Sequence, residues 1–195
     1  MKYTFGKQTK RAGIVLAAAA AFAALGIGTA QAQEFAAASI TVETTGEGAG
    51  SLNCSFRETG LPYPGFVRYD CNSQYVGVLQ QCMYKNKAVG NSQLLIFQNI
   101  HPEEVENFDV KRNGSIRGTV ITNVPESATN ALICTAPAEL TTTSIRWCNN
   151  HLVDLTNNIT GATAAELFAQ LVTNGSGSVP SCAVLANGPF TTPGE

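Results

Sequence analysis

The sequence has little charge and few groups suited to acid–base chemistry. Only 13% of its 195 residues are Asp, Glu, Lys or Arg, and its two histidines are His101 and His151. It contains no G-x-S-x-G elbow, no C-x-x-C-H haem motif and no EF-hand spacing. No Lys/Arg cluster follows residue 11, so the electrostatic pattern typical of nucleic-acid or anionic-membrane binding is missing. We therefore expect no nucleic-acid partner and no cofactor.

Long hydrophobic runs are also missing, apart from one near the start. Four basic residues within positions 1–11 precede an apolar run over residues 12–27, and Ala30-Gln31-Ala32 follows. This order is typical of a secretory signal peptide. The run is shorter than the roughly 20 residues that a membrane-spanning helix needs. We therefore predict a signal peptide over residues 1–32, cleavage after Ala32, and no membrane span.

The predicted mature chain, residues 33–195, is acidic and large enough to fold alone. The leader holds four of the twelve basic residues and none of the fourteen acidic ones, so the remainder has a net charge of −6. A chain of this size can bury about two-thirds of its unfolded surface. We expect one secreted domain of bacterial type, either extracellular or periplasmic.

Six cysteines lie after the predicted cleavage site, an even number in a chain expected in an oxidising compartment, so disulfides are the favoured interpretation. Cys148 and His151 have metal-compatible spacing, but no second pair accompanies them, and we expect no metal site. The cysteines are Cys54, Cys71, Cys82, Cys134, Cys148 and Cys182.

Alternating apolar and polar residues predict several strands. Residues 39–44 alternate, and two further strands flank the turn at residues 60–65. Pairing those two as a hairpin sets Phe56 opposite Tyr69 and Cys54 opposite Cys71, which predicts a cross-strand Cys54–Cys71 bridge. Residues 94–100 are nearly all apolar and indicate a strand covered on both sides.

The segment around Asn113-Gly114 predicts another hairpin. Its hydrophobic register favours a three-residue loop over residues 112–114, with Gly114 left-handed and Val110 opposite Ile116. A short strand is expected at residues 132–134.

The long strand expected over residues 144–155 has two interpretations. Strict alternation points Asn149 and His151 in the same direction as Trp147, whereas a bulge near residues 148–149 directs Asn150 and Leu152 inward. The sequence leaves both open. Residues 163–172 combine a capping box with a helical apolar stripe and predict a helix.

These patterns together predict an all-β fold. We expect a two-sheet antiparallel, immunoglobulin-like sandwich of about seven or eight strands with one short peripheral helix, stapled by disulfides.

Three blocks, at residues 54–61, 113–116 and 152–158, resemble a set of small secreted bacterial β-sandwich proteins of unassigned function. The resemblance spans about residues 54–158. It implies a bridge between Cys82 and Cys134, and it leaves Cys148 to pair with Cys182. It implies a fold and brings no active site.

Two classes of function are consistent with the sequence. The leading hypothesis is a secreted non-enzymatic binding or surface-structural module, because such sandwiches present ligand sites on loops and edges. The alternative is an extracellular hydrolase acting on polysaccharide or peptide, with His151, Asp154 and an acid from residues 103–109 as candidates. If His151 and an acid converge in one cleft, the hydrolase is favoured. We assign no catalytic residue and expect an unknown extracellular ligand or surface component as partner.

The strand at residues 40–44 holds only one charged residue, Glu43, in a Thr-rich stretch. Edge strands without charge or proline can add to another sheet. This segment therefore either pairs within its own sheet or supports homotypic assembly through the N-terminal strand.

Overall fold

The structure is a computed structural model that describes residues 33–103, 105–125 and 132–187. The predicted signal peptide lies outside these residues. The strands and the helix are β1 (Glu34–Val42), β2 (Leu52–Thr59), β3 (Phe66–Tyr84), β4 (Lys87–Ile100), β5 (Asn107–Asp109), β6 (Ile116–Thr122), β7 (Glu139–Asp154), β8 (Ile159–Gln170) and α1 (Cys182–Asn187).

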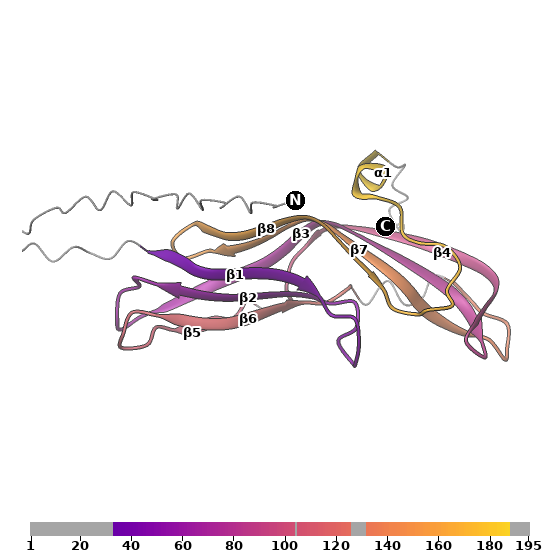
Figure 1. The fold of residues 1–195 in the computed structure, drawn as a ribbon, viewed down its shortest axis with the longest axis horizontal. Helices are drawn as coiled ribbons and strands as arrows, with labels where there is room; N and C mark the ends of the chain where they lie inside the picture. Colours follow the sequence, from indigo (N-terminus) through magenta and orange to yellow (C-terminus); the bar gives the residue numbers. More distant parts are fainter. Residues whose placement is uncertain (1–32, 104, 126–131, 188–195) are drawn as a thin grey trace, which may run out of the picture.

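The strands form two antiparallel sheets that pack face to face. The smaller sheet has the order β1-β2-β6, and the larger has β4-β3-β7-β8 with β5 added to β3. Figure 1 shows the smaller sheet below one half of the larger, while β3, β4 and β7 continue beyond it. The predicted all-β sandwich is confirmed; its immunoglobulin-like topology stays a prediction.

The predicted hairpin between β2 and β3 is wrong, although the disulfide it suggested is present. β2 pairs with β1 and β6, whereas β3 belongs to the other sheet. Cys54 and Cys71 face each other across the core, with their Cα atoms 5.8 Å apart. Phe56 and Tyr69 also meet across the core, with ring centroids 3.9 Å apart. The turn at residues 60–65 carries the chain from one sheet to the other.

Along one line across β4, β3 and β7, the larger sheet changes which alternate residues face the core. Its register places Asn99 of β4 and Asn149 of β7 on either side of Gln74 of β3. We call these three residues the phase-switch row. Both asparagines are left-handed, with φ of 53° and 55°, and Asn149 Nδ2 donates to Gln74 Oε1 at 2.6 Å. A left-handed residue interrupts the regular pleat, so the inward-facing positions change from one parity to the other.

The phase-switch row decides between the two interpretations of β7. Ile145 and Trp147 are buried on one side of Asn149, and Asn150 and Leu152 are buried on the other. The inward orientation of Asn150 and Leu152 is therefore confirmed. It arises at left-handed Asn149 without a register shift at that point.

The helix predicted over residues 163–172 is wrong, because most of this segment is strand β8, which pairs with β7. Leu167 lies opposite Trp147 and packs on the core. Phe168 points outward, and its ring centroid lies 4.6 Å from Cζ of the Arg146 guanidinium. Apolar residues on both faces of a strand imitate a helical stripe. The ladder along the 16-residue β7 outweighs the weak helical propensity.

Other local predictions have mixed outcomes. Lys111 N donates to Ser115 O, and Gly114 has a φ of 68°, which confirms the three-residue loop. The hairpin predicted around it is wrong beyond the loop, because β5 pairs with β3 and β6 pairs with β2. The strand at residues 132–134 is absent. β4 is an edge strand of the larger sheet, and both of its faces are covered in part: Leu95 and Phe97 pack on the main core, and Ile96 packs on the cluster with Val179 and Leu185. The N-terminal strand pairs within its own sheet, with β2.

The C-terminal segment packs on the outer face of the larger sheet. Gly77 of β3 leaves room there: a Cβ at this position would lie 2.5 Å from Val179 and 3.0 Å from Leu185. Cys148–Cys182 ties the segment to β7, and Cys82–Cys134 is also formed. All three predicted bridges are therefore present, as expected of a protein from an oxidising environment. No helix in the described ranges is long and apolar enough to cross a membrane.

The phase-switch row gives the first testable prediction. We expect Asn149→Ala to lower the free energy of unfolding by about 1–2 kcal/mol, because alanine is strained in the left-handed region. Asn149→Gly should cost less, since glycine adopts this conformation freely. At Thr163, an exposed strand residue of β8, the order should reverse and glycine should be worse than alanine. Urea unfolding of the four variants measures this, and the same order at both sites would contradict it.

Candidate functional site

The structure does not bring His151 and Asp154 together. Asp154 is fully buried between the sheets, whereas His151 is half-buried on β7. The carboxylate of Asp154 accepts from the backbone N–H groups of Thr156 and Asn157 at 2.8 and 3.0 Å, so it holds the turn after β7. Asp154 is therefore a structural residue. Among the described residues, neither His151 nor Asp154 lines a surface depression with the acids at 103 and 106.

A second buried carboxyl group lies near Asp154. Glu58 of β2 is 0% exposed, and its Oε2 accepts a hydrogen bond of 2.8 Å from the Tyr69 hydroxyl. Tyr69 is itself the register partner of Asp154. The sequence alone does not predict this cluster. A glutamate near the end of a strand is ordinarily exposed, and Glu58 is buried only because the opposite sheet covers it.

Burial raises the pKa of Glu58 from its ordinary value of 4.5 to about 7. The hydrogen bond from Tyr69 opposes this rise, and the negative charge of Asp154 adds to it. Burial, followed by the hydrogen bond with Glu58, also raises the pKa of Tyr69. The cluster is enclosed in the core, so it acts on stability rather than on a ligand.

A row of polar residues crosses the outer face of the larger sheet. Asn72 lies opposite His151, which lies opposite Thr163. Asp70 Oδ2 accepts from Asn72 Nδ2 at 2.7 Å and lies 3.0 Å from His101 Nδ1. The Asp70 side chain is 8% exposed and that of His101 57%, so a nearly buried carboxylate orients an exposed imidazole. This pair joins residues 31 apart in sequence, and only the sheet brings them together.

A polar groove lies at the edge of the sandwich. It has a volume of about 600 Å³, and three of its lining residues are glutamates. We call it the acidic groove. It is lined by Glu43, Thr45, Gly48, Ser51, Asn53, Pro102, Glu103, Glu106, Ile121 and Asn123.

The groove continues into a neighbouring depression. This second hollow, of about 350 Å³, shares Glu103 and Asn123 with the first and extends to Glu47. The two therefore form one elongated surface with four carboxylates. Of the residues that the structure describes, no lysine, arginine or histidine lines either part. The acids at positions 103 and 106 that the sequence offered for catalysis lie here, apart from His151.

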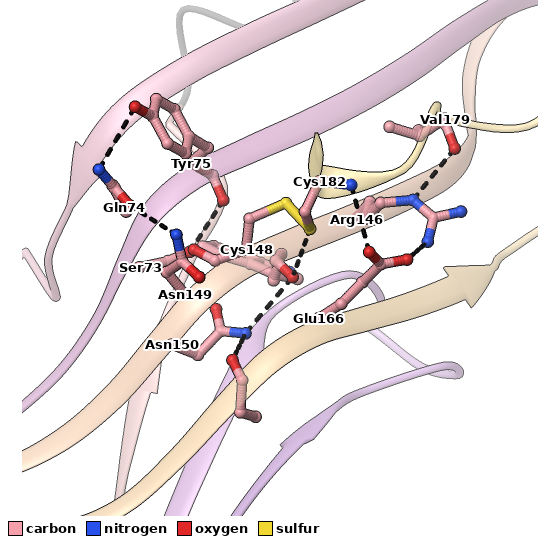
Figure 2. The surroundings of a disulfide bond; sticks show 12 residues. Ser73, Gln74, Tyr75, Arg146, Cys148, Asn149, Asn150, Glu166, Val179 and Cys182 are labelled. Carbon is pink, nitrogen blue, oxygen red and sulfur yellow. Dashed lines mark hydrogen bonds and ion pairs between the residues drawn. A yellow bond between two sulfur atoms is a disulfide. The ribbon is translucent and has the colours of Figure 1, made fainter. Parts of the chain in front are cut away.

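The base of the C-terminal segment is a fixed cluster around the Cys148–Cys182 bridge (Figure 2). Arg146 Nε donates to Val179 O at 3.1 Å, and its guanidinium forms an ion pair with Glu166. The other oxygen of Glu166 accepts from the Cys182 N–H at 3.2 Å. These contacts satisfy the polar groups locally, which favours a structural role.

Within the described ranges, no three His, Cys, Asp or Glu residues are arranged to hold a metal ion. Compared with protein-family models, curated proteins and solved structures, the chain has no significant match. The resemblance to secreted bacterial β-sandwich proteins therefore stays a prediction.

The Glu58 carboxyl group predicts how stability depends on pH. Its pKa is higher in the folded protein than in the unfolded chain, so the folded state binds the extra proton between about pH 4.5 and pH 7. The contribution of Glu58 to the free energy of unfolding is full below that window, and it is lost as the pH rises through the window. We expect the melting temperature to fall as the pH increases across this range.

The Glu58→Gln variant tests the assignment, because glutamine keeps an acceptor for Tyr69 and does not ionise. Its melting temperature should change less with pH than that of the wild type. Glu106→Gln, at an exposed position, is the matched control and should keep the wild-type slope. Equal slopes in wild type and Glu58→Gln would show that Glu58 is not responsible.

Proposed function

We propose that this protein is a secreted, non-enzymatic binding module that takes a cationic ligand in the acidic groove. The observation that carries the proposal is the elongated groove with Glu43, Glu47, Glu103 and Glu106 and no lining cation. Carboxylates placed along a groove attract and orient positive charge. A peptide segment containing lysine or arginine is the simplest ligand of this kind.

The rest of the groove suits an extended peptide. Asn123 supplies an amide group with a donor and an acceptor, and Ile121 supplies an apolar contact that is 50% exposed. The groove is formed by loop residues between 43 and 51, by β2 and β6, and by Pro102, Glu103 and Glu106. Trp147 Nε1 donates to Gly50 O at 2.9 Å, so the loop is fixed to the core. A preformed loop lowers the entropy cost of binding.

The hydrolase alternative rests on the Asp70–His101 pair. A carboxylate at Nδ1 is the arrangement that orients a catalytic histidine, with the other nitrogen left to act as base. Among the described contacts, no serine, threonine or cysteine side chain is hydrogen-bonded to His101. Activity toward a polysaccharide or peptide that is lost in His101→Ala and kept in His151→Ala would favour the hydrolase over the binding module.

Peptide titration tests the proposed function. Hexapeptides rich in lysine and arginine should perturb the NMR signals of groove residues, and this binding should weaken with added salt. We expect Glu43→Gln/Glu103→Gln/Glu106→Gln to weaken binding about tenfold, because exposed charge pairs contribute about 0.2–1 kcal/mol each.

The matched control is Glu34→Gln/Glu139→Gln, which removes two exposed carboxylates outside the groove. This variant should bind as the wild type does. Equal weakening in both variants would indicate a general charge effect, and the absence of any groove perturbation would contradict the proposal.

A further inference from the structure

The edges of the two sheets are protected unequally. A sheet edge exposes unpaired N–H and C=O groups, and natural proteins block it with charge, proline, a bulge or a covering segment. The edge strands here are β1 and β6 in the smaller sheet and β4 and β8 in the larger, besides the three-residue β5, which pairs with the start of β3. Three of the four longer edge strands have evident protection.

β1 and β8 lie side by side at one flank of the sandwich, and Phe35 packs over Gly161. A Cβ at Gly161 would lie 2.7 Å from the Phe35 ring, so the two edges are in close contact. The third edge strand, β6, has only seven residues and carries Arg117. These three edges offer little length to an incoming strand.

The strand β4 is different. Residues 88–100 contain no charged residue and no proline, and among the described strands β4 pairs only with β3. Gly90 and Asn99 are left-handed and limit its regular stretch to residues 91–98. Leu94 within this stretch is 37% exposed. The larger sheet therefore ends in a neutral, apolar edge.

We propose that β4 is a homodimer interface, at which the β4 strands of two copies pair antiparallel about a two-fold axis and join the larger sheets. This interface needs no ligand in the acidic groove, although Glu103 and Glu106 of that groove also flank β4. The edge is neutral, so two copies of this acidic protein bring no like charges together along the paired strands.

The charges that flank β4 favour an antiparallel second copy. Lys85 and Lys87 lie at the start of the strand, and Glu103 and Glu106 follow its end. Antiparallel pairing places the lysine end of one copy beside the glutamate end of the other. Parallel pairing would place lysines beside lysines and glutamates beside glutamates.

The side chains of β4 also suit a two-fold axis perpendicular to the sheet. Leu94 and Ile96 share the face of Leu79 and Gly77, whereas Leu95 and Phe97 share the face of the main core. The axis keeps each face on its own side; with the axis near Leu95, Leu94 of one copy meets Ile96 of the other on the outer face, and the two Leu95 side chains meet on the core face. Cross-strand pairs of this kind stabilise antiparallel sheets.

Analytical ultracentrifugation of the disulfide-bonded protein over a concentration series tests the inference. We expect a reversible monomer–dimer equilibrium. With the axis near Leu95, Ser92 of one copy lies opposite Gln98 of the other, and both residues are exposed. Ser92→Lys/Gln98→Lys should therefore raise the dimer dissociation constant about tenfold, through like charges at two symmetric positions. Ser92→Glu/Gln98→Glu should do the same.

Mixing the lysine and glutamate variants in equal amounts should restore a dimer, because each then meets the opposite charge. A purely structural effect of the substitutions would not produce this rescue. Thr160→Lys/Ala165→Lys on the β8 edge is the control and should dimerise as the wild type does. A wild type that is monomeric at every concentration, or a dimer that the β4 variants leave unchanged, would overturn the inference.

Discussion

Which side chains of the larger sheet face the core depends on the phase-switch row. Without left-handed residues at Asn99 and Asn149, strict alternation would send Asn149 and His151 into the core and Leu152 toward solvent. With them, one sheet buries apolar residues in both of its halves, so it can pack on the smaller sheet and still continue beyond it. That continuation provides the surface for the C-terminal segment and the long edge of β4.

The core contains polar groups whose cost must be offset. Glu58 and Asp154 are fully buried at the end of the sandwich where the two sheets meet. A buried carboxylate loses much of its hydration, which the protein compensates by hydrogen bonds and by favouring the neutral form. Tyr69 and the turn after β7 provide those hydrogen bonds. The three disulfides lie at separate points, between the sheets, near the β3–β4 hairpin and at the C-terminal segment, and each restricts a different part of the unfolded chain.

The candidate sites are on the surface of this framework, and sequence reasoning found them only in part. It singled out the acids of residues 103–109, two of which line the acidic groove. It could not place Glu43 opposite them, because the loop carrying Glu43 is positioned by Trp147, about a hundred residues later. The Asp70–His101 pair was missed for a related reason: neither residue belongs to a motif, and adjacent strands bring them together.

The sequence by itself determined the features that depend on near neighbours or on residue type: the predominance of strands, the cysteine content and the loop at Gly114. Tertiary structure alone decided which strands share a sheet. The turn at residues 60–65 is compatible with a hairpin or with a crossing between sheets, and only burial of Phe56 against Tyr69 selects the crossing. The apolar residues of 159–170 fit either a helix or a strand with two covered faces, and tertiary structure selected the strand. The ladder that β7 provides is a long-range interaction, which local sequence does not encode.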